Sequence, residues 1–144
     1  MKWFEVRDYE QSRHYVSALP WAAISVSPSN DWPHLRLRNR VALLQLTVDN
    51  CQNADDVSRA FLFGGIFSHN QADQVFSFIE RHWSEVDSFL VQCEDGYTCA
   101  PAIAAALMRL LYGEDEWYFE NCNPNMAIYR TLLIRGFYSG LQLW

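Results

Sequence analysis

The chain has 144 residues, of which 50% are hydrophobic and 15% aromatic, and its formal net charge at pH 7 is -6. This length and apolar content suit a single folded domain, over residues 1–144, with a packed core. The negative charge argues against nucleic acid as the main partner, because binding to a phosphate backbone needs clustered Lys and Arg side chains.

The N-terminal part of the chain alternates helical and extended patterns. Residues 8–19 have an amphipathic pattern that predicts a short helix ending before Pro20. The apolar runs 22–27 and 41–48 are typical of buried strands. Residues 28–33, which begin and end with proline, separate the two runs as a loop.

A longer helix is predicted in the middle of the chain, where Ser68 is a suitable N-cap and the pattern continues to about Trp83. Apolar residues recur within it at three- and four-residue spacing, namely Ala72, Val75, Phe76 and Ile79. This stripe is typical of a helix face that packs against a core.

A strand, a tight loop and a helix start follow one another between residues 88 and 111. The apolar run 88–91 predicts a strand, and an alanine-rich helix follows with Pro101 in its first turn. Gly96 lets the intervening backbone turn without a Cβ clash. Free N–H groups and the helix dipole converge on such a loop, so we expect an anion site there and a lowered pKa for the Cys93 thiol.

Two further helices are predicted over residues 114–122 and 125–135, with Gly113 breaking the chain before them. The alternation of strands and helices predicts an α/β fold with a central, mostly parallel sheet and helices on both faces. The loop after Cys93 then lies at the carboxyl edge of the sheet, where such folds bind ligands.

The segment that begins at Cys93 resembles the signature of cysteine-dependent protein tyrosine phosphatases of the compact dual-specificity type, whose loop runs Cys, five residues, Arg, then Ser or Thr. Residues 123–133 are similar to a Pro-Asn…Tyr-Arg helix in bacterial and phage members. The resemblance implies that Cys93 is the nucleophile. It also implies a phosphate-binding loop made of Glu94, Asp95, Gly96, Tyr97, Thr98 and Cys99.

Three positions depart from that signature. Cys99 stands where the family has its arginine, Ala100 replaces the hydroxyl residue, and Gln92 replaces the usual histidine before the nucleophile. The arginine grips the phosphoryl group through two parallel hydrogen bonds and stabilises the transition state, which a cysteine cannot do. The departures predict a pseudophosphatase that binds phosphate or a phosphorylated protein without turnover.

The general acid implied by the resemblance is Asp49, at the end of a predicted strand, with Asp55 and Asp56 close by in the chain. Asp49 is equally typical of a solvated turn residue. Asp55 and Asp56 are also suited to cap or begin a short helix from residue 57.

Two other functions stay open at the level of the sequence. One is an active or weakly active phosphatase that forms a phosphocysteine intermediate on Cys93. The other is a thiol redox protein in which Cys93 and Cys99 pair, which requires their Cα atoms to lie within about 7 Å.

The remaining residues point to a cytoplasmic protein without a metal or other cofactor. The four cysteines are irregularly spaced and the chain has no long apolar segment, so we expect reduced thiols and no membrane association. The four histidines have no paired spacing with the cysteines, which disfavours a metal site. The apolar segments 60–67 and 136–144 suit contact with a protein partner or a second copy of the chain.

Overall fold

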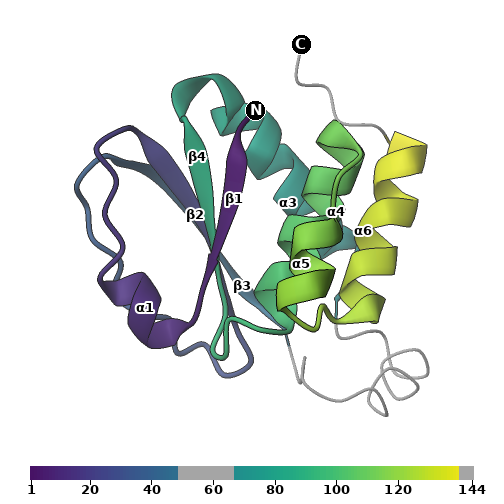
Figure 1. The fold of residues 1–144 in the computed structure, drawn as a ribbon, viewed down its shortest axis with the longest axis horizontal. Coiled ribbons are helices and arrows are strands. Elements are labelled where there is room, and N and C mark those ends of the chain that lie inside the picture. Colours follow the sequence, from purple (N-terminus) through teal and green to yellow (C-terminus); the bar gives the residue numbers. More distant parts are fainter. Residues whose placement is uncertain (49–66, 140–144) are drawn as a thin grey trace.

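The carboxyl ends of four parallel strands share one edge of the sheet. The structure is a computed structural model that describes residues 1–48 and 67–139. Within them the sheet has the order β1-β4-β2-β3, and every neighbouring pair is parallel. The strands are β1 (Trp3–Arg7), β2 (Trp21–Ser27), β3 (Arg40–Thr47) and β4 (Ser88–Gln92). They run from the top of Figure 1 to the bottom, so their carboxyl ends face the same way.

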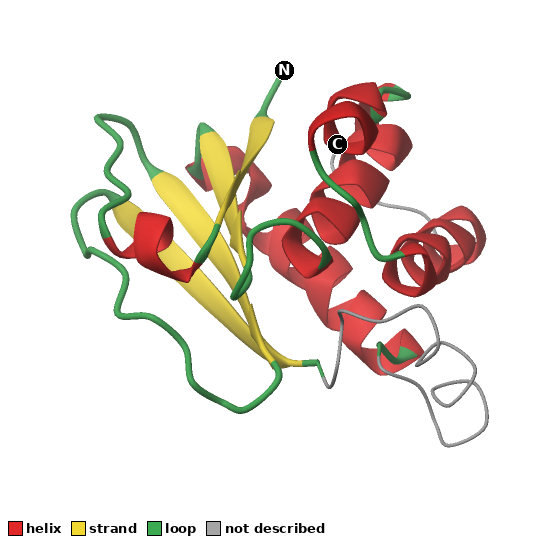
Figure 2. Cartoon of the chain, turned by 60° about the horizontal axis from the view of Figure 1, so that its bottom comes forward, coloured by secondary structure: helices red, strands yellow, loops and turns green. Residues whose placement is uncertain are grey.

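Most of the helical structure packs on one face of this sheet, and the short α1 lies on the other side (Figures 1 and 2). The described helices are α1 (Tyr9–Arg13), α3 (His69–His82) with the 3-10 turn η1 (Trp83–Glu85), α4 (Cys99–Tyr112), α5 (Glu116–Asn121) and α6 (Met126–Ser139). The predicted fold class is therefore confirmed: an α/β fold with a parallel sheet flanked by helices.

The described residues form two clusters of buried side chains that hold the layers together. The larger lies between the sheet and α3, α4 and α6, and it includes Phe4 and Phe89, whose rings stack 5.1 Å apart. The smaller lies on the opposite face, where Trp21 and Leu90 pack with Leu35. Because β4 is buried on both faces, the loop that follows it is fixed at the centre of the sheet edge.

The strongest local signals in the sequence give the expected elements. Ser68 caps α3 and forms a reciprocal capping box with Gln71. All four residues of the predicted stripe in α3 are buried in the larger cluster. Strands β2, β3 and β4 each lie within one residue of the predicted bounds.

Two N-terminal elements differ from the prediction. Strand β1 was not predicted, because Phe4 is its one fully buried residue and Glu5 and Arg7 interrupt any apolar run. Helix α1 follows an N-cap at Asp8 and ends at Arg13, whereas the prediction continued to Leu19. The apolar residues Val16 and Leu19, which extended the helical pattern, are exposed to solvent.

None of the helices in the described ranges is long and apolar enough to cross a lipid bilayer.

Candidate functional site: the loop after strand β4

The predicted loop joins the carboxyl end of β4 to the first turn of α4, and β4 lies between β1 and β2 in the sheet. Its edge of the sheet is at the bottom of Figure 1 and is turned forward in Figure 2. The structure therefore places residues 93–98 where an α/β fold gathers loops around a ligand.

The junction between β1 and α1 supports one side of this loop. Gly96 has a φ of +64°, and a Cβ placed on it would lie 2.6 Å from the backbone nitrogen of Asp8. The N–H of Tyr9 donates to the carbonyl of Glu94 at 3.1 Å. A glycine is thus required at position 96 both for the turn and for the close approach of the two backbones.

The connection between α5 and α6 supports the other side. The N–H of Asn123 donates to the carbonyl of Tyr97 at 3.0 Å, and the N–H of Asn125 donates to the carbonyl of Thr98 at 3.0 Å. These contacts hold loop carbonyls to the surrounding chain, so the loop's shape does not depend on any bound ligand.

Cys93 lies directly under the loop and is 4% exposed. Its thiol donates to Oδ1 of Asp95 at 3.3 Å, and its sulfur accepts the N–H of Ala100 at 3.3 Å. Burial, with the negative charge and hydrogen bond of Asp95, raises the pKa of Cys93 to about 11. The expected lowering of this pKa is wrong, because desolvation and a neighbouring carboxylate outweigh the N–H groups of the helix start.

The carboxylate of Asp95 accepts the loop's own N–H groups. Its Oδ1 accepts from the N–H of Tyr97 at 2.9 Å and from the N–H of Thr98 at 3.2 Å. Its Oδ2 accepts from the hydroxyl of Thr98 at 3.0 Å. An anion that belongs to the chain therefore already occupies N–H groups that sequence reasoning assigned to phosphate.

Cys99 is the first residue of α4 and is 3% exposed. It is disulfide-bonded, whereas Cys93 is a free thiol, so the two cysteines of the loop do not pair with each other. The expectation that all thiols are reduced therefore fails at Cys99, because irregular spacing along the chain does not reveal which cysteines the fold brings together.

Comparison with solved structures identifies proteins that have the same architecture. The human tyrosine phosphatase-like serine/threonine/tyrosine-interacting protein aligns with a TM-score of 0.59 and 15% identity, over 92% of this chain and 91% of that chain. Human DUSP28 aligns with a TM-score of 0.57 and 12% identity, over 94% and 92%. The chain has the dual-specificity phosphatase fold. A mouse dual specificity phosphatase, solved with zinc tungstate, aligns with a TM-score of 0.53 and 17% identity, over 83% and 70%.

Sequence-based comparisons add nothing to this likeness: no family model matches the chain, and neither does any curated protein. At these identities the shared property is the fold.

Gln92 directly precedes Cys93, and its side chain is buried in the core beneath the loop. It is 1% exposed, and its amide oxygen accepts the hydroxyl of Ser25 on β2. Gln92 therefore joins two neighbouring strands beneath the loop.

The three aspartates considered as general acids, Asp49, Asp55 and Asp56, lie outside the described residues, and the acid stays a prediction. Sequence reasoning included Asp95 in the loop but did not predict that its carboxylate accepts the loop's own N–H groups. The available signal was an aspartate followed at two and three positions by backbone N–H groups without helical partners, which is the pattern of an Asx turn.

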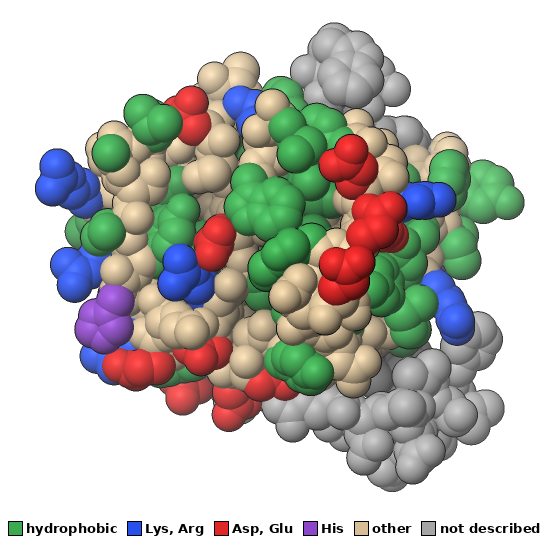
Figure 3. Space-filling view, viewed as in Figure 1, with side chains coloured by type: hydrophobic (Ala, Val, Ile, Leu, Met, Phe, Trp, Pro, Cys, Tyr) green, Lys and Arg blue, Asp and Glu red, His purple; other side chains and the backbone are tan. Residues whose placement is uncertain are grey.

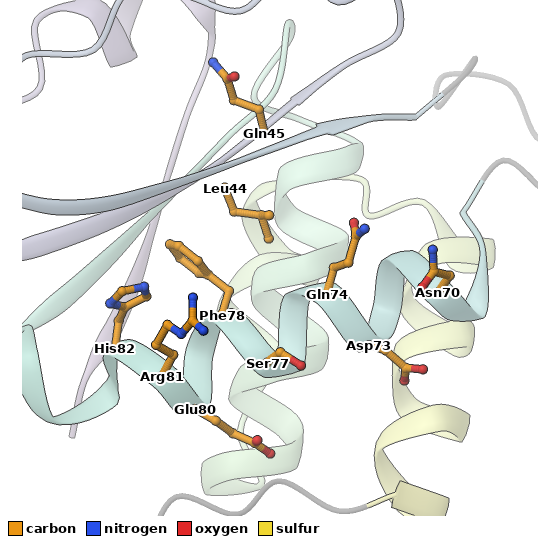
Figure 4. A pocket seen from close by; sticks show the side chains of 10 residues that line it. All are labelled: Leu44, Gln45, Asn70, Asp73, Gln74, Ser77, Phe78, Glu80, Arg81 and His82. Carbon is orange, nitrogen blue, oxygen red and sulfur yellow. The ribbon is translucent and has the colours of Figure 1, made fainter.

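Among the described residues, one cavity lies beside the loop and another lies away from it. One, of about 300 Å³, borders Glu94 and is lined by the side chains of Tyr9, Ser29 and Asp31 among others. The second, of about 830 Å³, lies between β3 and α3, where Leu44 points toward Phe78 (Figure 4). Neither is lined by Cys93.

The described parts of the chain contain no group of three or more His, Cys, Asp or Glu side chains placed to hold a metal ion.

Proposed function

We propose that the protein is a pseudophosphatase, which keeps the dual-specificity phosphatase fold but binds a protein partner instead of hydrolysing phosphate esters. The observation that carries the proposal is the residue at the start of α4. This loop resembles a signature that has an arginine at that position, whereas this chain has a buried, disulfide-bonded Cys99 there.

Phosphoryl transfer depends on stabilising the negative charge that spreads over the equatorial oxygens. An arginine does so with a planar fork of N–H donors, whereas a disulfide sulfur offers neither charge nor donors. Loss of one such group lowers a rate by about 10²- to 10³-fold, and more where it also holds the substrate.

The state of the thiol supports the same proposal. A cysteine nucleophile attacks as the thiolate, and a pKa of about 11 leaves Cys93 protonated at neutral pH. Ala100 contributes its N–H to the sulfur but has no hydroxyl to help a thiolate leave.

Exposed side chains on α6 favour a protein as the partner. Phe137 is 77% exposed and Tyr138 is 87% exposed, and Ile134 on the same helix is also exposed. Figure 3 shows hydrophobic side chains protruding at the right-hand margin, where α6 lies, and acidic side chains gathered over α5. Aromatic side chains beside charged ones are typical of interface centres and their rims. One structure with this fold is itself named as an interacting protein.

Hydrolysis of an aryl phosphate tests the proposal directly. Wild-type protein and Cys93→Ser are assayed at mildly acidic pH, with and without reductant, and both are expected to give the rate of buffer alone. Turnover by the wild type that disappears in Cys93→Ser would refute the proposal, because another group would then be replacing the arginine.

A gain-of-function pair checks that the fold is otherwise suitable. Cys99→Arg adds the missing guanidinium, and Ala100→Ser adds a hydroxyl close to the thiol. Position 100 is suitable because its backbone N–H already donates to the Cys93 sulfur at 3.3 Å. Cys99→Ser with Ala100→Ser is the matched control, which also lacks the disulfide but carries no guanidinium. Activity in the first variant and silence in the second would attribute the wild type's inactivity to the arginine position.

A further inference from the structure

The geometry points to Asp95 as an internal ligand of the loop, whose carboxylate holds the donors an oxyanion would use, so that an external anion binds only by displacing it. This inference concerns the same loop as the proposed function, and it rests on the proposal that this loop derives from a phosphatase loop. It adds a regulatory contact that the absence of an arginine does not require.

The contacts of Asp95 are those of a bound anion. Its two carboxylate oxygens accept from the N–H of Tyr97, the N–H and hydroxyl of Thr98, and the thiol of Cys93, at 2.9 to 3.3 Å. The same side chain thus contacts the candidate nucleophile and the backbone donors at once. A second anion on these donors would meet the Asp95 charge at contact distance, which strongly disfavours joint occupancy.

The contact can open without unfolding the loop. Asp95 is exposed, so its carboxylate can rotate into water. The loop backbone is held independently, through the carbonyls of Glu94, Tyr97 and Thr98 and through the packing of Gly96 on Asp8. When Asp95 swings out, the N–H groups of Tyr97 and Thr98 stay in place and are freed for an incoming anion.

Thiol chemistry reports on the same contact. The carboxylate accepts the Cys93 proton and places a negative charge beside the sulfur, and both effects oppose formation of the thiolate. Removing the carboxylate therefore makes the thiol more reactive as well as freeing the N–H groups.

The test compares three single variants with the wild type. Asp95→Ala removes the internal ligand, and Asp95→Asn keeps nearly the same shape without the charge. Glu114→Gln is the control, because it removes one negative charge from an exposed position outside the loop. Circular dichroism and urea unfolding verify that each variant folds.

Binding of tungstate and of orthophosphate is measured by titration calorimetry, with amide NMR shifts of Tyr97 and Thr98 to locate the site. Cys93 alkylation by iodoacetamide is followed by mass spectrometry at pH 8. Since hydrogen bonds to charged groups contribute about 1.5–3 kcal/mol, Asp95→Ala should strengthen oxyanion binding about 10- to 100-fold. Alkylation should become faster in the same variant, Asp95→Asn should be intermediate in both assays, and Glu114→Gln should match the wild type within about threefold.

Two results would overturn the inference. One is oxyanion binding by the wild type as tight as that of Asp95→Ala, and the other is faster alkylation in Asp95→Ala with no oxyanion binding at the loop. Neither outcome depends on turnover, so the inference can fail while the protein remains a pseudophosphatase. Conversely, turnover of an aryl phosphate by the wild type would refute the proposed function without these measurements.

Discussion

Gly96 and Gly113 offer a comparison that isolates the contact between the loop and the start of α1. Both have positive φ values, +64° and +75°, in which an alanine is strained by about 1 kcal/mol. A Cβ at Gly113 would have no heavy atom within 4 Å, whereas a Cβ at Gly96 would lie 2.6 to 2.9 Å from backbone atoms of Arg7 and Asp8. The difference between the two alanine variants therefore measures the close approach alone.

The difference in the free energy of unfolding depends on which backbone atoms must move to accommodate a Cβ at position 96. The backbone at Arg7 and Asp8 is joined to the loop by the Tyr9 to Glu94 hydrogen bond and by the Cys93 N–H to the Arg7 carbonyl. Relieving the clash lengthens both bonds, at about 1 kcal/mol each, and overpacking of a fixed site adds about 1 kcal/mol or more. We expect Gly113→Ala to lower the free energy of unfolding by about 1 kcal/mol and Gly96→Ala by about 4 kcal/mol.

Urea unfolding followed by circular dichroism measures both values, and equal m-values verify that the same surface is exposed in each case. Should the two variants agree within about 0.5 kcal/mol, the loop would not be fixed against the β1 to α1 junction as described. The loop would then also not keep its shape without a bound ligand.

Three further predictions concern the thiol, a buried hydroxyl and an ion pair. The Cys93 pKa is raised from an ordinary 9.0 to about 11, so the folded state keeps a proton that the unfolded state loses, and stability falls as pH rises from 9 to 11. By pH 10 the wild type should lose about 1 kcal/mol relative to Cys93→Ala, compared with their difference at pH 8; a constant difference would contradict this. Tyr118→Phe should lower the free energy of unfolding by about 1–2 kcal/mol, because the buried Phe4 carbonyl loses its 2.8 Å donor; no change in the urea midpoint would contradict this. Asp73→Asn removes one side of the exposed pair with Arg135, which lowers the pKa of that carboxyl, and its cost should stay below about 1 kcal/mol and shrink in 1 M NaCl.

Much of the fold could be predicted because its signals are local. A serine three residues before a glutamine marks the start of α3, and an apolar stripe at helical spacing marks its buried face. Strand β1 could not be predicted, since its place is set by pairing with β4 at residues 88–92, far along the chain, and not by its own pattern. The length of α1 was overestimated for the related reason that an amphipathic pattern does not show whether a core lies beneath it.

The site was predicted in part. Gly96 and Pro101 fix a turn and a helix start in any context, so the loop's position followed from the sequence alone. The thiol's pKa did not, because it depends on how deeply Cys93 is buried and on which side chain folds back over it. The pairing state of Cys99 was beyond reach for the same reason, as disulfides depend on distances that only the fold sets.

The loop places the Asp95 carboxylate and the Cys93 sulfur next to neighbouring backbone donors. The N–H groups at the start of α4 stabilise negative charge nearby, and both the Asp95 carboxylate and the Cys93 sulfur lie within their reach. The loop N–H groups donate to the Asp95 carboxylate, so the negative charge that they stabilise lies on that side chain. Once it is there, a second charge 3.3 Å away on sulfur is opposed by repulsion, and the thiol becomes a hydrogen-bond donor. The field that would prepare a nucleophile in such a loop thus stabilises Asp95, and the Asp95 charge adds to burial, which is the largest cause of the raised pKa of Cys93.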